Sequence, residues 1–317
     1  WLNFSHAIAQ DRYLIPGDAR RGWYVFSEKG CLQCHGMGES GKVAMAPDLS
    51  KSRPTHISSA GLAAEMWTHA PEMWGKMSAK WIKFNKLKET EMADIFAFLY
   101  FIRYLDEKGS PAQGKEVLET KGCTECHSIG EGRGKIGPDL AKWSEFSNPI
   151  LWLQMMWNHA LKMKSVMDQN AKAWPILGKN DVVNIIAYIS NFNKKPSKGK
   201  MFLSPGDPVE GKNMFSLKGC AQCHATEGAE SKSGPNLGVR RNDFPPTIGQ
   251  FASLMWNHFP GMFSQMQMKN IKVPELYFQD IANITSYLFS IRYFDPVGDG
   301  VAGRTVFQEK RCNVCHD

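Results

Sequence analysis

The chain has 317 residues, enough for two or three domains, and carries a net charge of +7. Hydrophobic residues make up 43% and charged residues 22%, a balance that supplies packed cores and excludes an intrinsically disordered chain. The longest unbroken apolar run, residues 95–102, is far shorter than the roughly 20 residues that a membrane-spanning helix needs. We therefore expect no membrane span. Because lysine and arginine are spread along the whole chain and form no long basic block, we expect no nucleic-acid partner either.

Residues 1–16 read as a helix of the kind that closes each repeat described below. Within them Arg12–Leu14 line up with Arg103–Leu105 and with Arg292–Phe294. The chain begins at Trp1 without an initiator methionine or a basic-then-apolar leader. We therefore expect a mature or trimmed product.

From residue 17 onward a repeating unit opens with a predicted helix that runs into a five-residue word, C-x-x-C-H. Successive words begin 92, 97 and 92 residues apart. Each opening helix carries a glycine and, four positions on, an apolar residue: Gly22 and Phe26, Gly114 and Leu118, Gly211 and Phe215, Gly303 and Phe307. All eight cysteines fall in the four words, which supply Cys31, Cys34 and His35; Cys123, Cys126 and His127; Cys220, Cys223 and His224; Cys312, Cys315 and His316.

C-x-x-C-H is the attachment motif of c-type haem, in which two thiols bond to the porphyrin and the histidine binds the iron. Disulfides would not require a histidine after every second cysteine, and a thioredoxin-like redox pair carries no such histidine. A zinc site built from two C-x-x-C pairs usually has its pairs about 15–20 residues apart, far closer than in this chain. The sequence therefore predicts four covalently bound haem c groups.

The rest of each complete repeat follows the same order. A GPDL-like turn places Pro47, Pro138 and Pro235 eleven or twelve residues beyond the histidine. A second helical segment follows, and an amphipathic closing helix ends the repeat. We place an N-terminal segment at 1–16, complete domains at 17–108, 109–204 and 205–297, and a partial fourth repeat at 298–317. The boundaries fall near Gly17, Gly109 and Pro205, and residues 194–205 are the most linker-like stretch.

On these motifs each unit resembles the class I c-type cytochromes, the family of mitochondrial and small bacterial cytochromes c. The resemblance implies an all-α fold: a tandem array of helical haem domains, three complete and a fourth truncated. It implies that the first and last helices of a unit cross where Gly22, Gly114 and Gly211 meet Phe98, Tyr188 and Tyr287. It also implies that the carbonyls of Pro47, Pro138 and Pro235 accept a hydrogen bond from the haem-binding histidine and fix its orientation.

The sixth ligand of each iron has several candidates at helical spacing. The sets are His69, Met73 and Met77; His159, Met163 and Met167; His258, Met262 and Met266. Small class I cytochromes use a methionine often some forty residues beyond the haem-binding histidine, which favours Met77, Met167 and Met266 by analogy. The nearer methionines and the histidines stay open as alternatives. A thioether ligand raises the reduction potential, whereas a second imidazole lowers it.

The fourth repeat stops one residue after His316, so another segment is expected to cover its haem. One interpretation is that the sequence is part of a longer array. The other is head-to-tail assembly, in which residues 1–16 of one subunit cover the terminal haem of the next and His6 reaches its iron. Such a heterologous contact would build a filament.

The predicted function is electron transfer through a row of four haems in a periplasmic or extracellular protein, because C-x-x-C-H haem attachment takes place outside the energy-transducing membrane. The alternatives are a polymeric cytochrome filament and the haem-bearing subunit of a membrane respiratory or photosynthetic complex. We do not expect an enzyme, because no repeat marks out an acid–base residue facing an open iron. The partners expected are redox proteins, and Lys29, Lys121 and Lys218 at the haem rims are candidates for guiding an acidic one.

Overall fold

The structure is a computed structural model that describes residues 17–37, 45–50, 58–82, 86–130, 136–143, 148–192, 206–226, 232–238, 245–292 and 298–316. The expected helix at residues 1–16, with His6, and the linker-like stretch 194–205 lie outside the described residues. The described part is all-α, and the single β-bridge within it joins His35 to Ala46. The fold class predicted from the sequence is confirmed.

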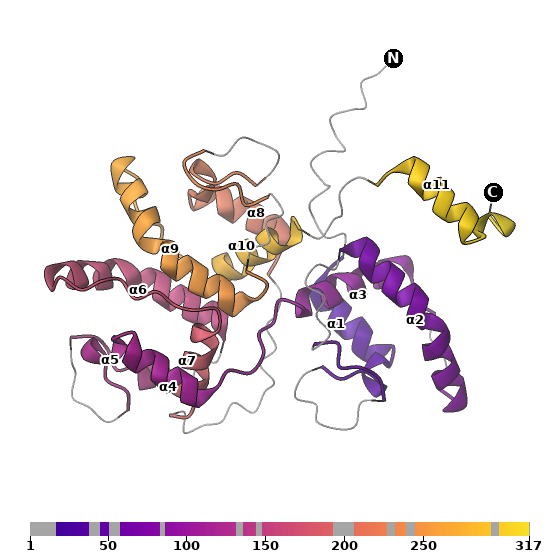
Figure 1. Ribbon diagram of the computed structural model, residues 1–317, viewed down its shortest axis with the longest axis horizontal. Coiled ribbons are helices and arrows are strands. Elements are labelled where there is room, and N and C mark those ends of the chain that lie inside the picture. The colour runs from indigo at the N-terminus through magenta and orange to yellow at the C-terminus, as the bar shows by residue number, and fades with distance from the viewer. Residues whose placement is uncertain are drawn as a thin grey trace, which may run out of the picture.

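The helices recur in the order expected (Figure 1). Repeat 1 contains α1 (Ala19–Glu28), η2 (Cys31–Gln33), α2 (Ser59–Ala79) and α3 (Glu89–Ile102). Repeat 2 contains α4 (Pro111–Thr120), α5 (Cys123–Cys126), η3 (Leu140–Trp143), α6 (Pro149–Gln169) and α7 (Asp181–Ser190). Repeat 3 contains α8 (Pro208–Leu217), η4 (Cys220–Gln222), α9 (Ile248–Met268) and α10 (Phe278–Ser290), and the partial fourth repeat has α11 (Gly300–Glu309) and η5 (Cys312–Val314).

Each opening helix packs against the closing helix of its own repeat, as α1 does on α3, α4 on α7 and α8 on α10. The crossing point is a glycine. A Cβ added at Gly22 would lie 2.7 Å from Phe98 Cβ, and one at Gly211 would lie 2.7 Å from Tyr287 Cβ. At Gly114 the same atom would lie 2.9 Å from Tyr188 Cβ. The glycine–aromatic crossings implied by the family resemblance are confirmed.

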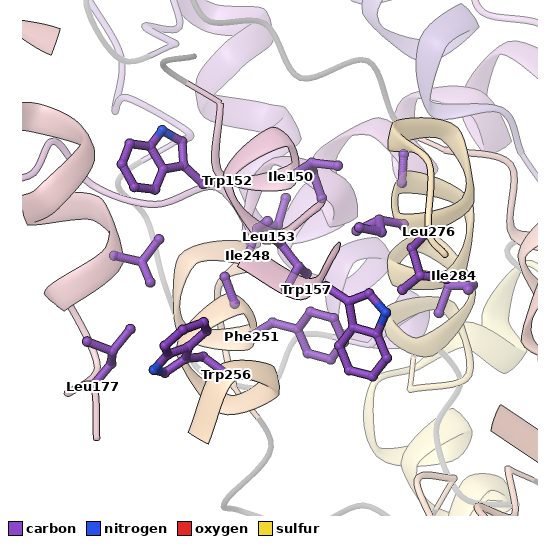
Figure 2. Close-up of a cluster of buried hydrophobic side chains, with 14 of the residues drawn as sticks. Ile150, Trp152, Leu153, Trp157, Leu177, Ile248, Phe251, Trp256, Leu276 and Ile284 are labelled. Carbon is purple, nitrogen blue, oxygen red and sulfur yellow. The ribbon is translucent and has the colours of Figure 1, made fainter. Parts of the chain in front are cut away.

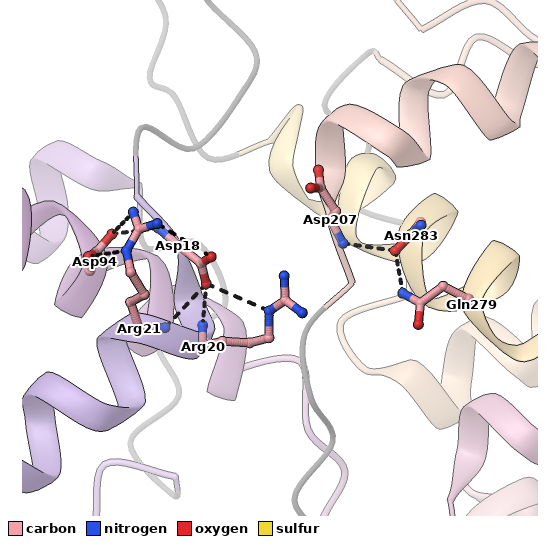
Figure 3. A network of polar contacts seen from close by, with 7 residues as sticks. All are labelled: Asp18, Arg20, Arg21, Asp94, Asp207, Gln279 and Asn283. Carbon is pink, nitrogen blue, oxygen red and sulfur yellow. Dashed lines mark hydrogen bonds and ion pairs between the residues drawn. The ribbon is translucent and has the colours of Figure 1, made fainter.

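Side-chain hydrogen bonds hold the start of each opening helix to the closing helix (Figure 3). The Asp18 backbone N–H donates to Asp94 Oδ1 at 2.7 Å, and the Asp207 N–H donates to Asn283 Oδ1 at 2.9 Å. In repeat 2 the Ser110 N–H donates to Asn184 Oδ1 at 2.8 Å. One polar side chain of the closing helix therefore satisfies an orphan N–H at the same place in all three repeats.

Repeats 2 and 3 share one apolar core, in which α6 packs against α9 (Figure 2). The indole N–H of Trp157 donates to the Pro274 carbonyl at 2.8 Å, and that of Trp256 donates to the Pro175 carbonyl at 2.8 Å. The next residue in each case, Asn158 or Asn257, exchanges two hydrogen bonds with the backbone of a leucine in the other repeat, Leu276 or Leu177. The contact is therefore reciprocal, with each repeat offering the same Trp-Asn pair and the same Pro-x-Leu loop.

Repeat 1 has a core of its own and meets repeat 3 at the end of α3. The Tyr104 ring stacks on Phe289 with centroids 3.8 Å apart, and the Tyr100 hydroxyl donates to the Phe289 carbonyl at 2.9 Å. The Gly249 N–H at the start of α9 donates to the Asp106 carboxylate at 2.7 Å. These contacts join repeat 1 to the pair formed by repeats 2 and 3.

Candidate functional site

The four C-x-x-C-H words share one hydrogen-bonded turn, which is α-helical in the second word and 3-10 in the other three. In each, the N–H of the histidine donates to the carbonyl of the first cysteine, at 3.0 Å for His35, 2.9 Å for His127, 2.9 Å for His224 and 3.0 Å for His316. The residue before the first cysteine has a positive φ; it is glycine in three repeats and Arg311 in the fourth. None of the eight cysteines forms a disulfide. Each word is thus a single tight turn that presents two thiols and an imidazole together.

The histidine of each complete repeat is oriented by a proline carbonyl. The Nδ1–H donates to the carbonyl of Pro47 at 3.1 Å from His35, of Pro138 at 2.9 Å from His127 and of Pro235 at 3.0 Å from His224. Since Nδ1 carries the proton, Nε2 is the nitrogen left for a metal. The hydrogen bonds expected from the family resemblance are confirmed.

Glycine before the proline allows the imidazole to lie close to the turn. A Cβ at Gly137 would lie 2.5 Å from Cε1 of His127, and one at Gly234 would lie 2.6 Å from Cε1 of His224. Repeat 1 has Ala46 at this position, where the backbone forms the bridge to His35. The turn therefore fixes the ring from two sides, by contact and by hydrogen bond.

An apolar pocket lies beside the word of repeat 2. Its wall includes the two cysteines and His127, the candidate ligands on α6, and several aromatic and aliphatic side chains. Those candidates are His159, Met163 and Met167, which all line the pocket. Such a lining fits a porphyrin, whose faces are apolar and whose iron needs nitrogen or sulfur ligands.

Part of this wall comes from places that the sequence motifs did not indicate. Trp143, Trp152 and Ile185 line the pocket from repeat 2, and Trp256 reaches it from repeat 3. Trp256 also stacks on Trp174, with centroids 4.2 Å apart. Repeat 3 therefore completes the pocket of repeat 2, a contribution that only the packing of α6 against α9 reveals.

The candidate sixth ligands lie as spacing predicted, on one face of α2, α6 and α9. The His69 ring has its centroid 6.2 Å from that of His35, and the His159 ring lies 6.0 Å from that of His127. The methionines follow one and two turns further along the same face. Met163, Met262 and Met266 also pack against the core that repeats 2 and 3 share. The assignment of Met77, Met167 and Met266 stays a prediction.

Burial affects the ionisation of these groups. It raises the pKa of the Cys123 and Cys220 thiols to about 11 in the haem-free chain. Burial, together with the neighbouring histidine, lowers the pKa of His35 and of His159. Both imidazoles are therefore neutral at pH 7, the form in which histidine binds metals.

Two of the rim lysines are held within their own repeats. The ammonium group of Lys29 lies 3.0 Å from the Glu91 carboxylate, and that of Lys218 lies 2.7 Å from the Asp280 carboxylate. Lys29 also donates to the Lys86 carbonyl at 3.3 Å, and Lys218 to the Glu275 carbonyl at 3.0 Å. Both lysines thus tie the end of the opening helix to the start of the closing helix, whereas Lys121 stays exposed.

The fourth word lies on a helix that is exposed along its length. Gly303 occupies the position at which Gly22, Gly114 and Gly211 meet a closing helix, yet a Cβ there would have nothing within 4 Å. Cys312, Cys315 and His316 are exposed as well. In the part of the chain that the structure describes, this word has the turn without a surrounding pocket.

Helical repeats with this turn, this oriented histidine and an apolar pocket define a c-type haem protein built from tandem domains. The Cytochrome c family model matches residues 19–100 and 208–292, more than half of the chain, and the chain belongs to that family. Family membership implies covalently bound haem c. Repeat 2 lies outside the matched ranges but has the same helix order and the same histidine–proline hydrogen bond.

No curated protein and no solved structure matches the chain significantly. Among the described helices, none is both long and apolar enough to cross a membrane. Cytochrome c domains are electron carriers and are typically exported proteins.

Proposed function

We propose that the chain transfers electrons through four covalently attached haems, one at each C-x-x-C-H word. The observation that carries the proposal is the repeated turn, in which the same N–H to carbonyl hydrogen bond sets the histidine beside the two cysteines at all four words. Bound haem supplies the one-electron chemistry of its iron. The paired thiols hold it covalently, and His35, His127, His224 and His316 are its proximal ligands.

The protein's part is to position the haems and to control their surroundings. The proline carbonyls fix the plane of the histidine rings, and the apolar side chains around His127 exclude water from that site. The shared core of repeats 2 and 3 holds their two sites in a fixed relation, and Trp256 belongs both to that core and to the pocket of repeat 2. A rigid spacing suits transfer from one haem to the next.

A reductive titration of the haem-loaded protein tests the number of carriers. The protein should take up four electrons per chain, and a variant with both Cys312→Ala and Cys315→Ala should take up three. Uptake of two electrons, matching only the two ranges that the family model covers, would contradict the count of four. A protein with no reducible haem would contradict the function itself.

A second candidate is a polymeric cytochrome, in which residues 1–16 of a neighbouring subunit pack on α11 as the closing helices do in the complete repeats. The open position beside Gly303 favours it. A contact of this type is heterologous and extends into a filament. Electron microscopy of the native holoprotein should then show regular fibres with one chain per repeat. Discrete single-chain particles would contradict it, and larger particles with other chains would indicate the subunit of a membrane complex. In each case we propose a periplasmic or extracellular site of action.

A further inference from the structure

The histidine pairs in repeats 1 and 2 have the same geometry. His35 and His69 lie with ring centroids 6.2 Å apart and planes at 61°, and His127 and His159 lie 6.0 Å apart at 64°. The two members of a pair come from different elements, the C-x-x-C-H turn and the long central helix. Their agreement between repeats indicates that a common requirement sets the separation.

A metal bound between two imidazoles sets such a separation. With metal–nitrogen bonds of about 2.0–2.1 Å, two rings on opposite sides of one ion have centroids about 6 to 6.5 Å apart. The observed separations of 6.2 and 6.0 Å fall within this range. Edge-to-face packing of two rings spans a wider range, about 4.5–7 Å, so the near-identical separation and angle in two repeats, and not the distance alone, point to a metal between the rings.

An acceptor group lies beside Nδ1 of two of the central-helix histidines. The Glu72 carboxylate lies 3.7 Å from Nδ1 of His69 on the next turn of α2. In repeat 3 the Nδ1–H of His258 donates to the Leu254 carbonyl at 3.0 Å. These are the partners that metal-binding histidines commonly have at the nitrogen away from the metal, and they leave Nε2 for it.

From this geometry we propose that His69 and His159 are the sixth ligands of the haem irons in repeats 1 and 2, opposite His35 and His127. The inference rests on the proposed function, since it requires haem at these words. The methionines one and two turns further on then serve as apolar walls, as Met163 and Met266 already do against the shared core. Imidazole on both sides gives each iron a lower reduction potential than imidazole with thioether.

Spectroscopy of the ferric holoprotein and of single variants tests the assignment. The wild type should lack the near-infrared charge-transfer band of histidine–methionine haem. His69→Ala should convert one haem per chain to a form that binds carbon monoxide when reduced, and His159→Ala should do the same. The matched variants Met77→Leu and Met167→Leu should leave the spectra and the carbon monoxide binding unchanged.

A methionine charge-transfer band that disappears in Met77→Leu or Met167→Leu would overturn the proposal, as would His69→Ala and His159→Ala proteins that bind no more carbon monoxide than the wild type. The mass of each denatured protein gives its haem content. A chain without haem contradicts the proposed function, whereas a loaded chain with methionine ligation contradicts the histidine assignment alone.

A different observation carries a second inference, about the surface of repeat 1. Trp157 and Trp256 are only 6% and 7% exposed because each is covered by the other repeat, whereas Trp67, at the same position of α2, is 83% exposed. Trp74 and Trp81 follow at seven-residue intervals and are exposed too. Trp67 is two residues from His69, so it lies on the face of α2 turned away from the candidate haem site.

Repeat 1 also keeps the leucine of the receiving half of this contact, although Asn85 stands where the other repeats have Pro175 and Pro274. Leu87 occupies the position of Leu177 and Leu276 before the closing helix, and it is only partly buried where those two are covered. A surface with both halves of a reciprocal contact is self-complementary, so a second copy related by a two-fold axis satisfies both. We propose that repeat 1 pairs with repeat 1 of a second chain, through the Trp67 face of α2 and the Leu87 loop.

Repeat 1 differs from repeats 2 and 3 at the residue whose side chain makes hydrogen bonds across their contact. Thr68 stands where Asn158 and Asn257 each make two hydrogen bonds across the interface, and its hydroxyl donates instead to the Ala64 carbonyl at 2.9 Å. The pairing between chains should therefore be weaker than the contact between repeats 2 and 3. Restoring the amide with Thr68→Asn should strengthen it.

Sedimentation of the haem-loaded protein over a range of concentrations tests this pairing. The wild type should form dimers, Trp67→Glu should weaken dimerisation at least tenfold, and Thr68→Asn should strengthen it. The control Tyr24→Ser, at a tyrosine that is 70% exposed on α1, should dimerise like the wild type. A wild type that stays monomeric, or dimers unaffected by Trp67→Glu, would overturn the proposal.

Discussion

Asp94 shows how one side chain of the closing helix sets the start of a repeat (Figure 3). It accepts a hydrogen bond from the Asp18 N–H and pairs with the Arg21 guanidinium, whose Nε lies 2.9 Å from Oδ2. Burial alone would raise the pKa of Asp94, but the hydrogen bonds from Arg21 and the Asp18 backbone outweigh it and lower the pKa below its ordinary value. Repeats 2 and 3 place Asn184 and Asn283 there, which keep the backbone hydrogen bond and replace the ion pair by an amide hydrogen bond with Gln113 and Gln279.

Two substitutions of Asp94 separate the contribution of its ion pair with Arg21 from that of its hydrogen bond with the Asp18 N–H. Asp94→Asn keeps an acceptor for the Asp18 N–H and loses the ion pair with the exposed Arg21, so we expect a loss of about 0.5–1 kcal/mol at pH 7. Asp94→Ala also leaves the Asp18 N–H unpaired, and its free energy of unfolding should fall by about a further 1–3 kcal/mol. Thermal unfolding of the holoproteins measures both.

The same residue predicts a pH dependence. Because its folded pKa is lowered, the stability that Asp94 supplies is present above its ordinary pKa and is lost as the pH falls through the folded value. The difference in unfolding free energy between wild type and Asp94→Asn should therefore shrink below about pH 4. A difference that stays constant from pH 7 to pH 3 would show that the ion pair contributes nothing.

At this scale the sequence predicts the histidine–proline hydrogen bonds through the family resemblance, because every complete repeat carries the same word and the same proline turn. It does not predict the pocket wall. Trp152 and Ile185 carry no motif, and Trp256 belongs to another repeat, so their roles depend on how whole helices pack. Spacing also left the sixth ligand undecided, since His159, Met163 and Met167 share one helix face.

The crossing of the opening and closing helices is the element on which each repeat depends. At Gly114 the two backbones touch, because an added Cβ would overlap the Asn184 carbonyl. The glycine therefore serves close approach, and its family signature made the crossing predictable from sequence.

Gly114→Ala should destabilise repeat 2 by about 1–3 kcal/mol, because the overlap forces α4 away from α7. Gly303→Ala is the matched control, at the same position of α11 with open space around it. It should be neutral or stabilise α11 by up to about 1 kcal/mol through helix propensity. Equal effects of the two substitutions on thermal unfolding would show that the crossing is not what constrains the glycine.

The reciprocal contact between α6 and α9 is an element that sequence reasoning missed. The Trp-Asn pairs are visible as a repeat, yet nothing in their spacing says that they bind a loop of the neighbouring repeat. A possible signal was the Pro-x-Leu sequence shared by Pro175–Leu177 and Pro274–Leu276 and changed in repeat 1, where Asn85 replaces the proline.

Asn158→Ala should lower stability by about 1–3 kcal/mol, because it leaves the Leu276 N–H and carbonyl without their partner. Thr68→Ala, at the equivalent exposed position of repeat 1, should change it by less than about 0.5 kcal/mol. Thermal unfolding compares the two. A loss as large in Thr68→Ala as in Asn158→Ala would place the effect within the helix and not at the interface.

At the scale of the whole molecule, the repeats do not form a simple string. The helices of repeats 2 and 3 lie together on one side and those of repeat 1 on the other (Figure 1). Repeats 2 and 3 share a core, whereas repeat 1 keeps its own and meets repeat 3 through Tyr104 and Phe289. The sequence predicts the number and order of the repeats, because each has its own motifs. It does not predict their pairing, which depends on side chains that touch across more than 80 residues of chain, such as Trp174 and Trp256.

The central claim is that all four C-x-x-C-H words carry a covalent haem, including the exposed one around Cys312 and Cys315. The most direct measurement is the mass of the denatured protein after export from a host that attaches haem c. We expect the polypeptide mass plus four haems. The mass of the bare polypeptide would contradict it.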